Sequence, residues 1–375
     1  MATIPSIAMI PSGYKANKVY SVLPTDGSGD LNFARTTTAT RVNQNGLIEE
    51  VAIGVPRLDY TDGSCPSLLL EPNSTNLITY SEDFSSLSVA ANAVVASNAV
   101  ISPSGLLDAD EITFDGTTDG RVEASIAATI GQPYTISLYL KNKDLSDVTQ
   151  VWIGFSQGGQ GQFVTITDEW QRYDITANAD GTTEYPRIQF SGTGSLYAWG
   201  FQTEQQSYAT SYIPTAGTTI SRTADTASKS GISSLINSSE GVLYAEIARK
   251  TGNTNSIAIS INDGSTSNAV SMYYYEANSL YVDIFNSFGT RTLSKLSIDT
   301  SIINKIAVKY KSGDNALWLN GVEVSTNSET FSLVGLNKLS FDYGNGALPF
   351  QGNCKDLKVY DQILTDAELQ ILTTI

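Results

Sequence analysis

The stretch YTISLYLKNKDLSDVTQVWIGF, residues 134–155, decides the fold of this chain. Its first part places Ile136, Leu138 and Leu140 at alternate positions, and its last part, QVWIGF, repeats this alternation around Trp152. A period of two is the pattern of a β-strand with one buried face. We therefore predict strands at residues 134–141 and 150–155.

Similar runs follow at residues 170–175, 185–190 and 195–201, at spacings of roughly ten residues, which are typical of a β-sandwich. The end of this block, WQRYDIT and then SLYAWGFQTEQQSYATSYIPT, is similar to the closing strands of jelly-roll carbohydrate-binding modules. The matching residues are Trp170, Arg172, Tyr173, Leu196, Tyr197, Trp199, Gly200, Gln202, Glu204 and residues 211–215. The resemblance implies a carbohydrate-binding-module-like jelly roll over residues 76–214.

The C-terminal part contains KIAVKYKSGDNALWLNGVEV and FQGNCKDLKVYDQILTDAELQIL. These runs resemble the laminin-G/concanavalin-A-like jelly roll, which implies a second β-sandwich over residues 239–375. The matching residues are Trp318, Asn320, Gly321, Gly352, Leu357, Val359, Tyr360, Leu364 and Glu368. Independently, the spacing of Thr365 and Glu368 is that of a capping box and predicts one short C-terminal helix. The Thr-, Ser- and Gly-rich residues 215–238 are expected to be a linker that can add an edge strand to a sheet.

Near the N-terminus, residues 33–84 predict two β-hairpins. Asn45–Gly46 and Asp62–Gly63 supply the positive backbone φ angles that tight hairpin turns require. The segment also resembles one that recurs in fibre-like bacteriophage virion proteins. The matching ranges are 35–42, 46–49, 55–60, 65–72 and 75–77. The resemblance implies a head or tail fibre or decoration protein in which residues 1–75, an N-terminal arm followed by β-hairpins, dock to the virion.

The predicted fold class is therefore all-β: two tandem jelly-roll β-sandwiches preceded by a β-hairpin docking segment and closed by one short helix. The virion resemblance implies capsid or tail proteins as partners, assembly in the host cytoplasm and location in the virion. It also leads us to expect a homo-oligomer, with a trimer as the specific expectation.

Composition excludes several classes of function. The net charge of −16 argues against a nucleic-acid partner, because phosphates are bound by Lys and Arg. The sequence has no apolar run long enough to cross a bilayer and no recognisable secretion signal, so we expect no membrane insertion. Histidine is absent, which removes Ser-His-Asp and Cys-His catalysis. Cys65 and Cys354 fit no metal or redox spacing and are expected to stay reduced.

Two sets of candidate site residues follow from the strand pattern. If the apolar residues of the first sandwich point inward, its outer face presents Tyr139, Trp152, Arg187 and Gln189, which could bind a glycan or pack against a neighbour. The densest acidic cluster is LLDADEITF, in which Asp108, Asp110 and Glu111 form either a solvated turn or a calcium site. No other cofactor is expected.

We therefore predict a non-enzymatic virion protein that displays β-sandwiches for adhesion to host or environmental glycans. The alternative is a polysaccharide-degrading glycoside hydrolase or lyase of concanavalin-A-like fold. That alternative needs two carboxylates facing one cleft. Its candidates are Glu246 and Asp283, although neither lies in the Glu-x-Asp-x-x-Glu pattern that glycosidases of this fold often carry.

Overall fold

The computed structural model describes residues 3–117, 119–144, 148–155, 159–286 and 289–375. Within these ranges the chain is almost entirely β-strand and turn, and it divides into two compact units. The first unit gathers Met1–Thr38, Val51–Pro72 and Ala224–Ile375, and the second gathers Ala39–Glu50 and Asn73–Thr223. The prediction of an all-β protein made of sandwiches is confirmed.

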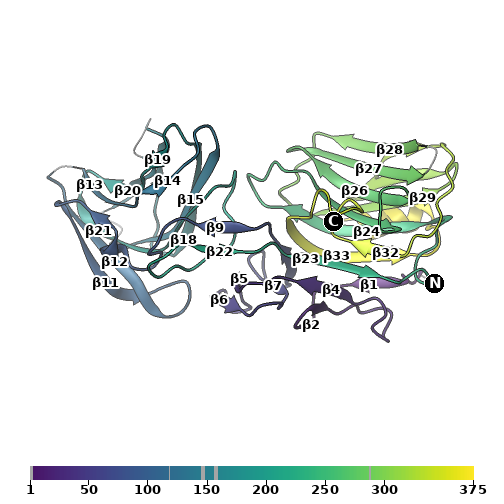
Figure 1. The fold of residues 1–375 in the computed structure, drawn as a ribbon, viewed down its shortest axis with the longest axis horizontal. Helices are drawn as coiled ribbons and strands as arrows, with labels where there is room; N and C mark the ends of the chain where they lie inside the picture. Colours follow the sequence, from purple (N-terminus) through teal and green to yellow (C-terminus); the bar gives the residue numbers. More distant parts are fainter. Residues whose placement is uncertain (1–2, 118, 145–147, 156–158, 287–288) are drawn as a thin grey trace. The chain divides into compact units, whose positions relative to one another are not determined.

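The first unit is a sandwich of two antiparallel sheets (Figure 1). One sheet has the order β31 (Val322–Asn327), β30 (Asn315–Leu319), β29 (Asn304–Lys311), β24 (Glu240–Arg249), β33 (Gly352–Tyr360), β8 (Ser67–Leu70) and β7 (Arg57–Asp59), with β1 (Ile7–Met9) also on β33. The other has the order β2 (Tyr14–Lys15), β3 (Lys18–Val19), β4 (Leu31–Ala34), β23 (Thr226–Ser230), β32 (Lys338–Ser340), β25 (Ile257–Asn262), β26 (Ala269–Tyr275), β27 (Ser279–Asn286) and β28 (Gly289–Leu296). Alternate residues of both sheets, such as Leu243 and Ile259, are fully buried between them.

The second unit is a smaller sandwich (Figure 1). One sheet has the order β10 (Ser88–Val89), β13 (Gly120–Glu123), β20 (Pro186–Phe190), β16 (Gln150–Phe155) and β17 (Gly161–Thr165). The other has the order β11 (Ala93–Ile101), β12 (Leu107–Asp115), β21 (Thr193–Glu204), β15 (Pro133–Asn142) and β18 (Gln171–Asn178). Short pairs join β14 (Ile126–Ala127) to β19 (Thr183–Glu184), and β9 (Ser74–Asn76) to β22 (Ile220–Arg222). As predicted, Ile136, Leu138 and Leu140 point into the core and are fully buried.

Both N-terminal hairpins form as predicted, but they belong to different units. β5 (Ala39–Val42) pairs with β6 (Ile48–Val51), and nearly all of this hairpin belongs to the second unit. β7 pairs with β8, which is hydrogen-bonded to β33 in the first unit. The hairpins are therefore parts of two sandwiches rather than one separate segment.

The predicted boundaries at residues 75 and 238 do not coincide with the units. Ile7 lies opposite Val359 and Phe33 lies opposite Ala227, so strands of the first 38 residues complete sheets of the C-terminal block. β23 falls within the expected linker, residues 215–238, yet it is an inner strand of a sheet, hydrogen-bonded to β4 and to β32. Strand periodicity reveals which face of a strand is buried, but it does not identify the hydrogen-bonding partner, which can be far away in sequence.

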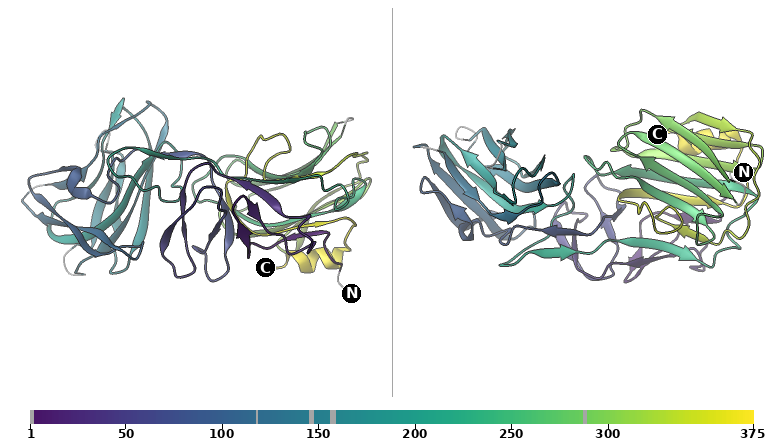
Figure 2. Two further views of the ribbon diagram at one scale, coloured as in Figure 1. Left: turned by 60° about the horizontal axis from the view of Figure 1, so that its bottom comes forward. Right: turned by 45° about the horizontal axis from the view of Figure 1, so that its top comes forward.

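The C-terminal helix α1 (Asp366–Thr373) forms as predicted, with the capping box of Thr365 and Glu368 complete. Leu364 and Leu369 are buried against Trp318 and Tyr244 on the face of the β24–β29–β30 sheet that points away from the core. Figure 2 shows the helix, in yellow, lying along the outside of this sheet. The same unit contains both cysteines as free thiols, Cys65 exposed and Cys354 buried.

A buried group of four charges holds the first unit together at the β7–β8 hairpin. The guanidinium of Arg57 donates to Glu71 Oε2 at 2.5 Å and to Asp225, and Arg35 Nη1 donates to Asp225 Oδ1 at 3.1 Å. All four side chains are at most 1% exposed. Burial alone would lower the pKa of Arg57, but Asp225 and Glu71 outweigh that effect and raise it.

Replacement of one member of this buried group is expected to destabilise the protein strongly. Asp225→Asn leaves two buried arginines facing one carboxylate, so we expect the free energy of unfolding to fall by about 3–5 kcal/mol. Urea denaturation measures the change. The matched control is Glu240→Gln, which breaks the exposed ion pair with Lys311 and should cost no more than about 1 kcal/mol. Equal effects of the two substitutions would contradict the prediction.

Candidate functional site

The outer face of the β10–β13–β20–β16–β17 sheet, the face away from the core, carries a row of large side chains. Ile153 and Ile188 are fully buried in the core, so their neighbours Trp152 and Gln189 point outward. In the ladder, Trp152 lies directly opposite Gln189 on one side and Phe163 on the other. The strand pairing therefore places an indole, a phenyl ring and a carboxamide side by side.

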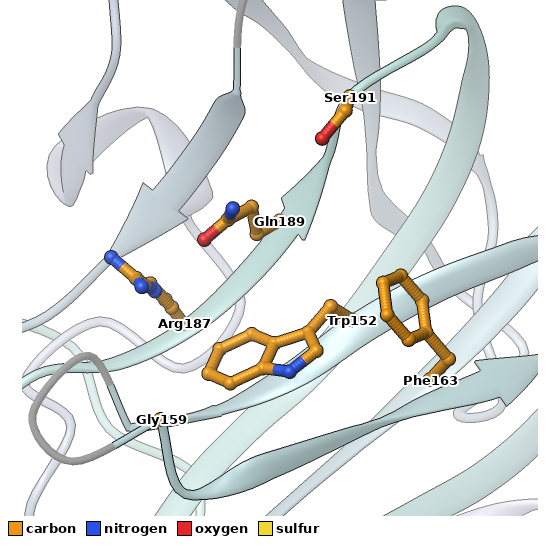
Figure 3. A pocket seen from close by; sticks show the side chains of 6 residues that line it. All are labelled: Trp152, Gly159, Phe163, Arg187, Gln189 and Ser191. Carbon is orange, nitrogen blue, oxygen red and sulfur yellow. The ribbon is translucent and has the colours of Figure 1, made fainter.

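These side chains line an open hollow of about 240 Å³, which we call the Trp152 hollow. Its lining residues are Trp152, Gly159, Phe163, Arg187, Gln189 and Ser191. Figure 3 shows the two aromatic rings together on one side, and Arg187, Gln189 and Ser191 along the other. Trp152 is half-buried, whereas Phe163 is 67% exposed. An aromatic floor with planar polar groups at its edge is thus open to solvent.

Two glycines make room for the indole ring. Gly154 and Gly161 are paired across β16 and β17 on the same face as Trp152. A Cβ atom on Gly161 would lie 2.3 Å from Trp152 Cζ2, and one on Gly154 would lie 2.6 Å from Trp152 Cη2. The indole therefore lies against bare backbone. Any side chain at either position would push the ring away from the sheet.

Arg187 fixes the other side of the hollow. Its guanidinium carbon lies 5.2 Å from the centroid of the Trp152 ring, and its Nη1 lies 3.7 Å from Glu123 Oε2. Arg121 Nε lies 3.2 Å from the same carboxylate oxygen. Burial lowers the pKa of Arg187, while Glu123 and Asp119 counteract this effect. The two arginines thus share one carboxylate, that of Glu123.

Three of the four residues predicted for glycan binding meet in this hollow, and Tyr139 does not. Tyr139 lies on β15 in the other sheet, where its ring packs at 5.6 Å from Trp199. The β5–β6 hairpin contributes Val42 and Ile48 to the cluster around Trp199 and Tyr212, and this cluster occupies the outer face of that sheet. The strand pattern groups Tyr139 with the other three because alternation does not reveal which of the two sheets a strand joins.

Phe163 also lines the hollow and is not among the predicted residues, although its strand carries a signal for it. In QFVT, Val164 is buried in the core and Phe163 is its outward-facing neighbour. A large aromatic residue at an outward position of a strand is the same signal that identified Trp152.

No family model and no curated protein sequence matches this chain. Among solved structures, the CBM40 module of the Ruminococcus gnavus IT-sialidase, bound to α2,3-sialyllactose, is 21% identical with a TM-score of 0.33; the match covers 36% of this chain and 83% of that one. The CBM22-1–CBM22-2 tandem of Paenibacillus barcinonensis Xyn10C is 10% identical with a TM-score of 0.28; the match covers 76% of this chain and 97% of that one. Domains LG4-5 of the mouse laminin α1 chain are 8% identical with a TM-score of 0.27; the match covers 72% of this chain and 89% of that one. Scores at this level assign neither a family nor a ligand to this chain.

The predicted calcium ligands do not converge. The Asp110 carboxylate accepts the backbone N–H groups of Phe84 at 2.8 Å and Asn98 at 2.9 Å, so both of its oxygens are used within the fold. Glu111 points to the opposite side of β12 and pairs with Lys143. In the part of the chain that the structure describes, no group of three acidic, histidine or cysteine side chains could hold a metal ion. Asp110 stabilises the turn of η1 (Phe84–Ser86) instead.

The two carboxylates of the alternative enzyme hypothesis lie in different sheets. Glu246 is on β24, where it accepts the Tyr244 hydroxyl at 2.7 Å and pairs with Lys305 at 3.4 Å. Asp283 is on β27 and accepts hydroxyls from Tyr273 at 2.9 Å and Thr292 at 2.7 Å. Since each points away from the core that separates the sheets, the two do not face a common cleft.

In the described ranges, no helix is both long and apolar enough to span a membrane.

The contact of the Trp152 ring with Gly154 and Gly161 can be tested directly. Gly161→Ala should displace the Trp152 ring, because the new Cβ would also lie 2.4 Å from the carbonyl oxygen of Ile153. We expect a loss of about 1–3 kcal/mol in unfolding free energy and a changed Trp152 emission, obtained as the difference from a Trp152→Phe background. Ser191→Ala, at the rim, is the control and should leave the emission unchanged. An unaltered spectrum in Gly161→Ala would show that the ring does not rest on the glycines.

Proposed function

We propose that this protein is a non-catalytic glycan-binding protein and that the Trp152 hollow is its binding site. The observation that carries the proposal is the row formed by Phe163, Trp152 and Gln189, bordered by Arg187. The apolar face of a sugar ring stacks on aromatic rings, and its hydroxyl groups pair with planar donors and acceptors. Both kinds of group are present at one open surface.

The packing of the Trp152 ring supports this proposal. The Trp152 ring lies against the backbone of Gly154 and Gly161 and beside the guanidinium of Arg187. Arg187 in turn forms an ion pair with Glu123 at 3.7 Å. Ordering the Trp152 ring on ligand binding should therefore cost little conformational entropy.

Loss of one ring should weaken glycan binding by at least about tenfold, which corresponds to about 1.4 kcal/mol. Trp152→Ala and Phe163→Ala remove the stacking surfaces, and Phe163→Ala should do so with little effect on stability because the ring is 67% exposed. Binding is measured for the full chain on a glycan array and then by calorimetry with the glycans that bind. Tyr139→Phe is the control and should bind like the wild type, since Tyr139 lies in the other sheet. A folded wild-type protein that binds no glycan on the array would refute the proposal.

We also propose that the chain is a structural component of a bacteriophage virion, as a head or tail fibre or decoration protein. The resemblance of residues 33–84 to a segment of virion proteins supports this role, in which the β-sandwiches are displayed for adhesion. Its partners would be capsid or tail proteins, and the assembled form would be a homo-oligomer such as a trimer.

Mass spectrometry of purified phage particles tests the virion role. We expect the chain in intact, density-purified particles at a constant copy number relative to the major capsid protein. Native mass spectrometry of the isolated protein should give a mass that is a multiple of 40.2 kDa, with three copies for a trimer. Absence of the chain from purified particles would contradict the virion role and leave the glycan-binding proposal to be judged on its own test.

A further inference from the structure

We infer that the site binds a linear chain of several neutral sugars that runs across the strands, rather than a single terminal sugar. This inference rests on the proposed function. It starts from a second hollow of about 170 Å³ in the same unit, which we call the Ser88 hollow. Its lining includes Ser86, Ser88, Glu123 and Ser125.

Cross-strand pairing connects the two hollows. Gly161, Gly154, Arg187, Glu123 and Ser88 are successive partners in the ladders of β17, β16, β20, β13 and β10. They form one row on one face of the sheet, parallel to the row that contains Phe163, Trp152 and Gln189. Neighbouring strands lie about 4.8 Å apart, so the row is about 19 Å long. A path of this length is several times as long as one sugar ring.

Glu123 is the residue shared by both hollows. It lines the Ser88 hollow, and its carboxylate pairs with Arg187 of the Trp152 hollow. The side chains beside this path change in character along it. The aromatic rings of Phe163 and Trp152 lie in the parallel row at β17 and β16, whereas Glu123 and Ser88 supply a carboxylate and a hydroxyl group at β13 and β10. Such a series can stack one sugar and hydrogen-bond the hydroxyl groups of the next ones.

The charges favour a neutral chain. The described residues that line the Ser88 hollow include one carboxylate, that of Glu123, and no lysine or arginine. An acidic sugar in the Ser88 hollow would therefore find no cation in the lining to pair with, whereas a neutral sugar can donate hydroxyl groups to Glu123.

Calorimetry of the full chain with neutral linear oligosaccharides tests the inference. The probes are cello-, xylo-, manno- and malto-oligosaccharides, each from the disaccharide to the hexasaccharide. For the series that binds, we expect affinity to rise by at least about tenfold from the disaccharide to the hexasaccharide. Oligogalacturonate of the same lengths is the charged comparison and should bind more weakly.

Ser125→Leu tests the Ser88 hollow by itself, because Ser125 is an exposed residue of that hollow. It follows β13, which β20 separates from β16, the strand that carries Trp152. The substitution should reduce the hexasaccharide affinity to that of the disaccharide and leave disaccharide binding unchanged. The control is Ser328→Leu, at an exposed position in the first unit, and it should change neither.

The outcomes distinguish the inference from the function on which it rests. Equal affinity for all lengths, an unaffected hexasaccharide in Ser125→Leu, or tighter binding of oligogalacturonate overturns the extended neutral site alone. If none of the probes binds and the glycan array is also blank, the proposed function and the inference fail together.

Discussion

The first unit depends on a charge-neutral group of buried side chains, Arg35, Arg57, Glu71 and Asp225. Arg57 comes from β7, Glu71 follows β8, and Asp225 precedes β23, so the group connects segments that are up to 190 residues apart. The backbone N–H of Glu71 also donates to Asp225 at 2.9 Å. A buried charge is tolerated only when it is paired and hydrogen-bonded, and therefore these segments must meet in one arrangement.

This group gives a structural role to charged residues of the segment 33–84. Its charged residues Arg35, Arg57 and Glu71 are members of the buried group, and Arg41 pairs with Glu49 at 2.7 Å within the β5–β6 hairpin. They serve the packing of the sandwiches, and none of them lines the Trp152 hollow.

Sequence reasoning was accurate where one strand carries the whole signal. The alternation in QVWIGF predicted β16 at its observed bounds, and the outward residues Trp152, Arg187 and Gln189 do meet at one site. It failed where the answer depends on segments distant in sequence. Tyr139 follows the same alternation, yet residues of the β5–β6 hairpin occupy its surroundings. The grouping of β1 with β33 and of β4 with β23 is likewise absent from any local pattern.

The pairing of β1 with β33 has a consequence for the order in which the protein forms during synthesis. The second unit ends at Thr223, so all of its strands have been translated while more than a third of the chain is still missing. The first strand of the other unit must wait for nearly the last residues, because Ile7 lies opposite Val359. Domains generally fold as units when their sequence is complete. During translation the second unit, which carries the hollow, can therefore fold first, whereas the sheet of the first unit stays incomplete until β33 has been made.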